Sequence, residues 1–328
     1  MTGRGIFRLY LVAALSSSFV RLSNGFCLSL LLLAGCATPP RPTSAPPSSP
    51  AQFTLGAELV LQLNLPGGKQ FDASGLLLTP GGDLLTVNDK GPILYRIEFL
   101  PGAAEANLIP FPNCFTASQL APFSREKTGH YDCEGIAQDP EGRLYICEEA
   151  NRWILRCDPK ANLVERLPID WSSVKNYFSS DPNASFEGIA IGNGKLYVAN
   201  ERSNPVIIVV DLRSLKVIDH FQVYPQKFSL LGTHYSDLSW YDGKLFVLCR
   251  QHRVVLQVDP DSHAVLVEYD YQDLEDRLGY NKQFPVGIME GLAVERDYFW
   301  LATDNNGFAR RGHPNDIRPT LLKCPRPR

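Results

Sequence analysis

The fold of this chain is decided by FEGIAIGNGKLYVAN, residues 186–200, in which two β-rich runs flank the turn Gly192-Asn193-Gly194. Short apolar runs bounded by turn residues predict a pair of antiparallel strands. The same arrangement recurs along the sequence at steps of roughly 50–60 residues, a period typical of repeat architectures. The second residue of the quoted stretch, Glu187, corresponds to Ser74, Glu134, Ser236 and Glu290 in the other units, and we call these five the repeat positions.

Each unit continues with further β-rich runs, so that four strands fill roughly 50 residues, which is typical of propeller blades. We therefore predict an all-β chain that forms a β-propeller of five four-stranded blades, with six blades as the alternative. The last unit has only three strands, whereas an orphan run at 58–66 precedes the first unit. This N-terminal strand is expected to complete the last blade and to close the ring without an open sheet edge.

The N-terminal stretch carries the features of an export signal. Residues 1–36 contain three Arg and no acidic residue, and a compact apolar run at 28–33 leads into Ala34-Gly35-Cys36. These features are typical of a secretory signal. Residues 33–36 (LAGC) resemble the lipobox of bacterial lipoproteins, in which the cysteine is lipidated. A single membrane-spanning helix is the alternative, but it requires about 20 continuous apolar residues, and 21–25 (RLSNG) interrupt the run.

These features divide the chain into three parts: a lipoprotein signal peptide at 1–36 with lipidation at Cys36, a Pro/Ser-rich tether at 37–52, and a propeller domain at 53–328. A Pro/Ser-rich segment remains extended and acts as a spacer. Ala37 follows the cysteine, and by resemblance to that class this favours the outer membrane. The expected location is the cell envelope, with the lipid anchor as the membrane partner and the domain facing the periplasm or the surface.

The charge and the cysteines exclude one class of function and predict one crosslink. The formal net charge is −3 and becomes −6 once the three Arg of the leader are removed. A nucleic-acid binder carries a basic patch; none is present in the sequence, so nucleic acid is not an expected partner. Six cysteines follow Cys36, and an oxidising compartment permits disulfides among them. A bond between Cys114 and Cys133, closing the one long insertion, is the expected pairing.

A second set of polar side chains follows the repeat positions at a constant offset along the chain. In a hairpin, the start of the first strand lies beside the end of its antiparallel partner. Both sets are therefore expected on one face of the ring, around the axis. The second set is Asn88, Glu148, Glu201, Arg250 and Asp304, and the residues directly after it are Asp89, Glu149, Arg202, Gln251 and Asn305.

Six carboxylates of these two sets are predicted to converge on an axial funnel. Two unit charges about 4 Å apart repel by roughly 4 kcal/mol in partly shielded surroundings, so the cluster requires a cation, protonation or basic partners. Hard oxygen ligands suit Ca²⁺ or Mg²⁺ better than zinc, and Ca²⁺ is the expected cofactor. The expected metal ligands are Glu134, Glu187, Glu290, Asp304, Asn88 and Asn305.

The alternative is that each acid caps a strand end, accepts backbone N–H bonds and stays hydrated. His130 and His234 precede two of the repeated strands. They are candidates for acid/base groups or anion contacts, with packing at the rim as the alternative.

The sequence resembles the SdiA-regulated propeller proteins at 72–76 (DASGL), 87–89 (VND) and 134–137 (EGIA). It is also similar to proteins with esterase-like activity of phytase, at 236–238 (SDL) and at 290–293 (EGLA) with 304–306 (DNN). The resemblance covers about 53–326. It implies a propeller in the cell envelope, five-bladed in the first family, and a calcium-linked phosphoesterase activity in the second. Ser236 and Arg250 depart from it, since they replace acids in the fourth unit.

Two functions follow from these features. The first is a binding propeller whose acidic funnel holds Ca²⁺ together with a small anionic ligand or a protein partner. The second is a metal-dependent hydrolase of phosphate esters or lactones, in which the cation polarises the substrate and generates a hydroxide. The candidate catalytic residues for the second function are Glu148, Glu201, His130 and His234 as bases, and Arg250, Arg202 or Lys90 as anion contacts.

Overall fold

The computed structural model describes residues 49–328 except 127–130, 182 and 281–285. The signal peptide, Cys36, most of the tether and His130 lie outside the described residues. Residues 48–328 form one compact unit. Within the described ranges, no helix is both long and apolar enough to cross a membrane.

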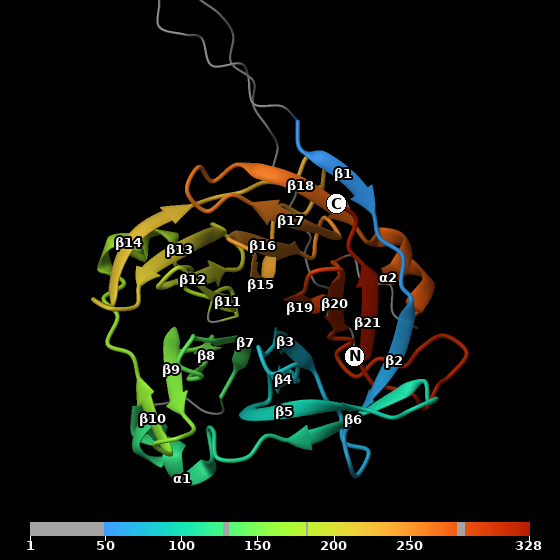
Figure 1. Cartoon of the computed structure of the whole chain (residues 1–328), viewed down its shortest axis with the longest axis horizontal. Helices are drawn as coiled ribbons and strands as arrows, with labels where there is room; N and C mark the ends of the chain where they lie inside the picture. Colours follow the sequence, from blue (N-terminus) through green and yellow to red (C-terminus); the bar gives the residue numbers. More distant parts are fainter. Residues whose placement is uncertain (1–48, 127–130, 182, 281–285) are drawn as a thin grey trace, which may run out of the picture. The chain divides into compact units, whose positions relative to one another are not determined.

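Each repeat unit forms an antiparallel sheet whose strands run from the axis outward in chain order, and the sheets stand radially around one axis in a β-propeller (Figure 1). Two sheets have four strands. One contains β7 (Cys133–Gln138), β8 (Leu144–Glu148), β9 (Trp153–Asp158) and β10 (Leu163–Arg166). The other contains β11 (Phe186–Gly192), β12 (Lys195–Asn200), β13 (Val206–Asp211) and β14 (Lys216–Phe221).

A third sheet gains an additional strand at its outer edge. It contains β15 (Tyr235–Tyr241), β16 (Lys244–Cys249), β17 (Val254–Val258) and β18 (Val265–Asp270). The added strand is β1 (Ala51–Thr54), which pairs in parallel with β18. The predicted tether therefore ends earlier than expected, because residues 51–54 contain no proline and can pair with the free edge of β18.

The last sheet contains eight strands because two groups of four meet at their outer edges. One group is β3 (Ala73–Leu78), β4 (Leu84–Asn88), β5 (Gly91–Phe99) and β6 (Glu105–Pro110); the other is β19 (Met289–Val294), β20 (Tyr298–Thr303), β21 (Thr320–Pro325) and β2 (Leu59–Asn64). As predicted, the N-terminal strand β2 pairs with the C-terminal strand β21. β2 also pairs in parallel with β6, so the two groups form one continuous sheet.

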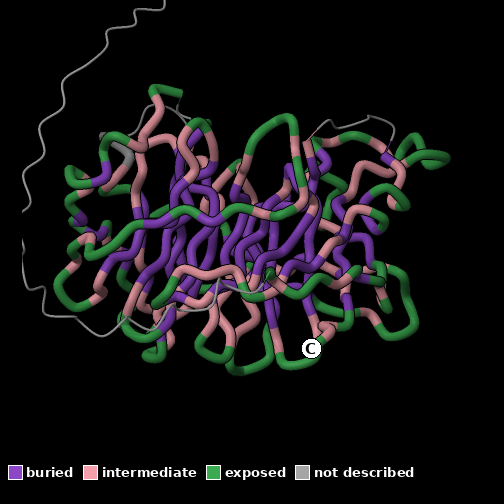
Figure 2. The backbone as a smooth tube through the Cα atoms, turned by 90° about the horizontal axis from the view of Figure 1, so that it is seen from above, coloured by how far each residue is buried: buried purple, intermediate pink, exposed green. Residues whose placement is uncertain are grey.

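Helical segments lie in the connections between sheets. They are α1 (Ala117–Leu120), α2 (Gln272–Leu278) and the 3-10 turns η1 (Ala121–Glu126) and η2 (Ser172–Tyr177). The core lies between neighbouring sheets, where side chains such as Ile207 of β13 and Val247 of β16 belong to one buried cluster. Buried backbone accordingly fills the interior of the domain, and exposed residues lie at the two faces and the outer edge (Figure 2).

The predicted disulfide is wrong. Cys114 bonds to Cys157 of β9, with the two Cα atoms 5.8 Å apart. Cys133 is a buried free cysteine at the start of β7. The insertion that carries Cys114 packs against the outer strands of its sheet, as the hydrogen bond from Gln119 Nε2 to Asn162 Oδ1 shows. Cys114 therefore bonds to the third strand of the sheet and not to the first. The spacing of the cysteines along the chain does not reveal this pairing, because it depends on the order of the strands in the sheet.

Candidate metal centre

The polar position of each repeat lies at a β-bulge. The pairing of every inner strand with its neighbour shifts register at this point, for example between Cys133 and Ile136 in β7 and between Phe186 and Gly188 in β11. Equivalent shifts occur in β3, β15 and β19. A bulge leaves one residue unpaired and redirects its side chain. In these strands the redirected residues include Glu134 and Glu187, and both line a cavity.

This cavity has a volume of about 540 Å³ and lies where the inner strands of all the repeat units begin. Seven acidic side chains and three basic ones line it, so acids are in clear excess. The acids are Asp89, Asp132, Glu134, Glu149, Glu187, Glu290 and Asp304, and the bases are Lys90, Arg202 and Arg250. Ser74, Ala150, Asn183 and Asn306 complete the lining.

Two groups of three acids place carboxylate oxygens close enough to share one cation. The groups are Asp132, Glu134 and Glu149, and Glu149, Glu187 and Glu201; within each, one oxygen from every residue lies within 4.8 Å of the others. Glu149 belongs to both groups. Ca²⁺ binds oxygens at about 2.3–2.6 Å, so ligands on opposite sides of one ion lie at about this separation. The donor set therefore fits a hard divalent cation.

Arg250 occupies the side of the cavity where the fourth unit lacks an acid. Its guanidinium pairs with Glu201 and Glu290. Glu201 is fully buried, and Arg202 Nη1 lies 2.7 Å from its Oε2. On the opposite side, Lys90 Nζ pairs with Asp89 and lies 3.3 Å from Asp72 Oδ2.

Arg250 leaves part of the adjacent carboxylates unsatisfied. Glu290 is only 7% exposed, and its Oε2 has no hydrogen-bond partner among the described residues. A buried acceptor without a partner costs free energy. Because Glu290 lines the cavity, this oxygen is available to a bound ion.

The pKa values of the acids reflect burial and mutual repulsion. Burial, followed by the charge of Glu134, raises the pKa of Glu149 to about 9, and burial with the charge of Asp72 raises that of Asp304 to about 7. Burial also raises the pKa of Glu187 well above its ordinary value, reinforced by Glu201. For Glu201, burial is outweighed by the hydrogen bond from His234 and by the charges of Arg250 and Arg202, so its pKa is lowered.

These shifts predict that the metal-free protein loses stability as pH rises. Burial raises the pKa of Asp89 to about 6, so Asp89, Asp304 and Glu149 keep protons in the folded chain that the unfolded chain releases near pH 4. Stability is then greatest at and below about pH 4 with respect to these groups, and it falls as pH rises through their folded pKa values. Each unit of raised pKa corresponds to about 1.4 kcal/mol, so we expect Asp304 alone to account for a loss on the order of 3 kcal/mol between about pH 5 and its folded pKa of about 7. Asp89 and Glu149 add to this loss up to about pH 9.

Thermal unfolding in a chelator across this pH range measures the effect. Asp304→Asn removes one titrating group and is expected to flatten the profile near pH 7. The lowered pKa of Glu201 has the opposite effect, because its contribution to stability is lost as pH falls. This loss occurs only at and below the ordinary pKa of 4.5. A melting temperature that rises steadily from about pH 5 to pH 9 would contradict the assignment.

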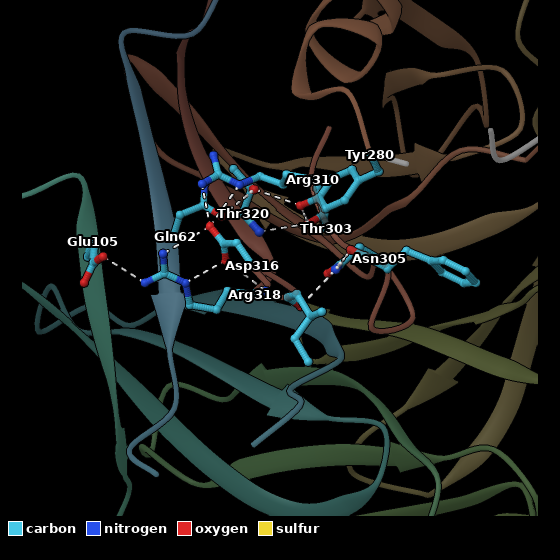
Figure 3. Close-up of polar contacts among 11 residues, drawn as sticks. Gln62, Glu105, Tyr280, Thr303, Asn305, Arg310, Asp316, Arg318 and Thr320 are labelled. Carbon is cyan, nitrogen blue, oxygen red and sulfur yellow. Dashed lines mark hydrogen bonds and ion pairs between the residues drawn. The ribbon is translucent and has the colours of Figure 1, made fainter. Parts of the chain in front are cut away.

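The sequence prediction and the cavity agree for only part of the expected ligand set. Glu134, Glu187, Glu290 and Asp304 line the cavity, whereas Asn88 and Asn305 do not. Asn305 donates through Nδ2 to the carbonyl oxygens of Phe308 and Ile317 and lies toward the polar cluster around Thr303 and Thr320 (Figure 3). Its role is to hold the loop that follows β20. Asn88 accepts a bond from the backbone N–H of Lys90 at 3.2 Å.

The expected catalytic residues are also divided. Glu148 is fully buried outside the cavity, and its Oε2 accepts the backbone N–H of Asn151 at 2.9 Å, so it caps the turn after β8. Side chains alternate along a strand, which directs Glu149 and not Glu148 to the axis. His234 Nδ1 lies 3.3 Å from Glu201 Oε1 and 3.2 Å from Gln251 Nε2, so it supports Glu201 from outside the lining.

Three cavity acids were not among the candidate ligands or catalytic residues: Asp89 and Glu149, which were noted only as following the second set, and Asp132. Asp132 lies two residues before Glu134, and residues spaced by two share a face of an extended strand. This spacing was the available signal. Asp132 precedes the repeated phrase, and only Asp72 of the first unit is acidic at the same position of another unit; Ser185, His234 and Ile288 occupy it elsewhere.

The comparisons with known proteins agree with this architecture. A family profile described as "Phytase-like: Esterase-like activity of phytase" matches residues 69–307. A search of curated protein sequences finds no match. Glutaminyl cyclase from Myxococcus xanthus has a similar structure, with a TM-score of 0.55 and 15% sequence identity over 84% of this chain and 97% of that one.

Other solved structures superpose less well. Virginiamycin B lyase from Staphylococcus aureus has a TM-score of 0.40 and 14% identity, over 80% of this chain and 73% of that one. Aldose sugar dehydrogenase from Streptomyces coelicolor has a TM-score of 0.43 and 13% identity, over 81% and 97%. At such identities the likeness concerns the fold alone, and neither of these two superpositions bears on function.

Proposed function

This chain belongs to the phytase-like family, described by its esterase-like activity of phytase, and on that premise we propose that its acidic cavity binds a divalent cation, with calcium as the first candidate, together with a small anionic ligand. We further infer that the propeller has five blades, the first and last of which join edge to edge through β2 and β6. We also propose that the chain is an envelope lipoprotein anchored through Cys36 in the outer membrane.

One observation supports cation binding above all: two groups of three acids share Glu149, and every member except Glu201 lines the same cavity. The three basic side chains cannot balance seven acids, and the raised pKa values indicate that the remaining charge is costly in the absence of a cation. A divalent ion at either group would allow those carboxylates to ionise. Calcium accepts six to eight oxygen ligands in flexible geometry, which suits an irregular set of acids better than the strict octahedron of magnesium.

The basic side chains favour an anionic second ligand. Arg202 and Lys90 line the cavity and are partly exposed, at 29% and 58% of their side chains. A cation held by the acids would, together with the side chains of Arg202 and Lys90, present positive charge to a phosphate or carboxylate. This same observation supports hydrolysis of phosphate esters as the second candidate function, in which the cation supplies Lewis acidity and an activated water. In that function Arg202 and Lys90 orient the anion.

Calcium titration followed by thermal unfolding tests the proposal. A ligand at 100 times its Kd adds about 2.7 kcal/mol of stability, which corresponds to a rise in Tm of roughly 5 °C or more in a domain of this size. Glu187→Gln is expected to abolish most of this rise at about pH 8, since Glu187 belongs to one of the three-acid groups. Glu141→Gln is the matched control, because Glu141 is 65% exposed and outside the cavity.

The same samples can be assayed with a generic phosphomonoester to separate the two candidate functions. Calcium-dependent turnover that is lost in Glu187→Gln and in Arg202→Met identifies a hydrolase. Calcium stabilisation without turnover identifies a binding protein. An equal response to calcium of the parent chain, Glu187→Gln and Glu149→Gln, the last of which removes the acid common to both groups, would exclude the cavity as the metal site.

A further inference from the structure

The connection between β14 and β15 carries a cluster of exposed apolar side chains. Phe228 is 81% exposed, Leu230 88% and Leu231 52%, and Tyr224 adds a fourth at 56%. The other large apolar residues that are exposed in the described part of the chain lie at least six residues apart along the sequence. Scattered apolar residues are ordinary, whereas a contiguous exposed group marks an interaction site. We refer to residues 224–231 as the apolar loop.

The apolar loop lies on the face of the propeller where the cavity is located. It leaves the end of β14, which is beside the start of β13, since Phe221 pairs with Ile207. It returns through His234 to the start of β15, beside Glu201 of the cavity network. The loop therefore connects the outer edge of the ring to the cavity on a single face.

The tether meets the folded domain beside this loop. Gln52 of β1 donates through Nε2 to Oε1 of Gln226 at 3.0 Å, and Phe53, Lys227 and Glu268 line one pocket with both residues. Only the short segment 37–50 separates Cys36 from Ala51. At about 3.1 Å per residue in an extended Pro-rich chain, the tether reaches no more than roughly 45 Å. A lipid on Cys36 thus holds the sector that contains the apolar loop near the bilayer.

We propose that the apolar loop docks into the interface of the phospholipid bilayer that holds the Cys36 anchor, so that the cavity opens beside the membrane surface. This inference rests on the lipid anchor of the proposed function and not on the bound cation. Apolar contact is the chemistry of docking: Lys227 is occupied by Asp270 at 2.7 Å, and the mature chain is acidic overall. A neutral phospholipid surface therefore suits the loop better than an anionic one. A lipid chain combined with a second, weaker contact gives stable attachment.

Quenching of a tryptophan at position 228 tests the proposal. The full-length protein with Phe228→Trp is purified from membranes and incorporated into phosphatidylcholine vesicles, with or without lipid brominated near the top of its acyl chains. Side chains inserted at this depth lie about 5–10 Å below the surface, so we expect the added emission to shift to the blue and to fall by about half. Leu163→Trp is the control, because Leu163 is 55% exposed and begins β10 at the end that pairs with Asp158, on the opposite face.

A second variant tests the apolar character of the contact. Leu230→Asp and Leu231→Asp, added to Phe228→Trp, are expected to remove the quenching without changing the melting temperature, since both side chains are exposed. Equal quenching at positions 228 and 163, or none at either, would overturn the proposal, as would a mass spectrum of the mature protein without lipid on Cys36. A blue shift that grows with protein concentration and is insensitive to brominated lipid would show that a second copy of the chain covers the loop, which also overturns it. Calcium binding is measured separately, so its failure would leave this result unaffected.

Discussion

The Gly188→Val variant is expected not to fold into the closed ring, and Gly188→Ala to lose about 3 kcal/mol of unfolding free energy, at the upper end of the usual cost of overpacking. A Cβ atom at position 188 would lie 2.5 Å from Asp237 Cα and 2.7 Å from both Asp237 C and Leu238 N. These are backbone atoms of the next inner strand and cannot rotate away. Relief requires that β11 and β15 separate, which would open the contacts between the adjacent sheets.

The effect belongs to the position and not to glycine in general. A Cβ at Gly56 would meet no atom within 4 Å, so Gly56→Val and Gly56→Ala are matched controls and should unfold close to the parent chain. Urea unfolding followed by tryptophan fluorescence measures the difference. An unchanged midpoint for Gly188→Ala would show that the inner strands are not in close contact around the axis.

Replacement of Arg250 by methionine is expected to cost about 4 kcal/mol at pH 8, because removal of one partner leaves buried charge uncompensated. Its guanidinium contacts Glu201 and Glu290, and Glu201 is fully buried. Without Arg250, Glu201 loses one of the charges that lower its pKa, so it ionises at higher pH than in the parent chain. The deficit should therefore shrink as pH falls toward about 5, where the unfolded chain begins to gain protons as well.

Calcium should restore part of the lost stability, since a divalent cation can replace the guanidinium as the counter-charge. Lys244→Met is the control, because Lys244 pairs with Asp259 at 2.8 Å but is 33% exposed, and exposed pairs contribute about 0–1 kcal/mol. Denaturant unfolding at about pH 8 and about pH 5, with and without calcium, gives the loss of unfolding free energy of each variant under all four conditions. A deficit that is independent of both pH and calcium would indicate that Arg250 acts only through packing.

The repeated phrase predicted the main features of the fold because it encodes local structure. Each copy of the phrase begins an inner strand, and the turn residues that follow define its hairpin, so the strands and their order could be deduced from the sequence. The pairing of β2 with β21 could also be deduced, since the last unit lacked one strand. The Cys114–Cys157 bond could not, because it depends on how a long insertion packs against an outer strand.

The site was predictable in location but not in composition. The constant offset between the two sets of polar side chains brought both to one end of the sheets. Which of two consecutive residues faces the axis depends on strand register. In the second unit, Glu149 lines the cavity and Glu148 does not. In the last unit, Asp304 lines it and Asn305 does not. The contacts of Arg250 depend on how neighbouring sheets are arranged around the axis, because they join the third unit to the fifth through the fourth.

Asp237 occupies the position at which the other units have glycine, and this affects whether ions can pass through the centre of the propeller. Its Oδ2 accepts the backbone N–H groups of Leu76 at 3.2 Å and Leu292 at 2.7 Å. Its side chain thus spans the centre between three inner strands, with the acids on one side and a pocket lined by Leu78, Ile191 and other apolar residues on the other. Among the described residues, Asp237 and the strands that it joins separate the acidic cavity from the apolar pocket on the other face. We therefore expect ions and ligands to reach the acids from the face on which the cavity lies and not through the centre of the ring.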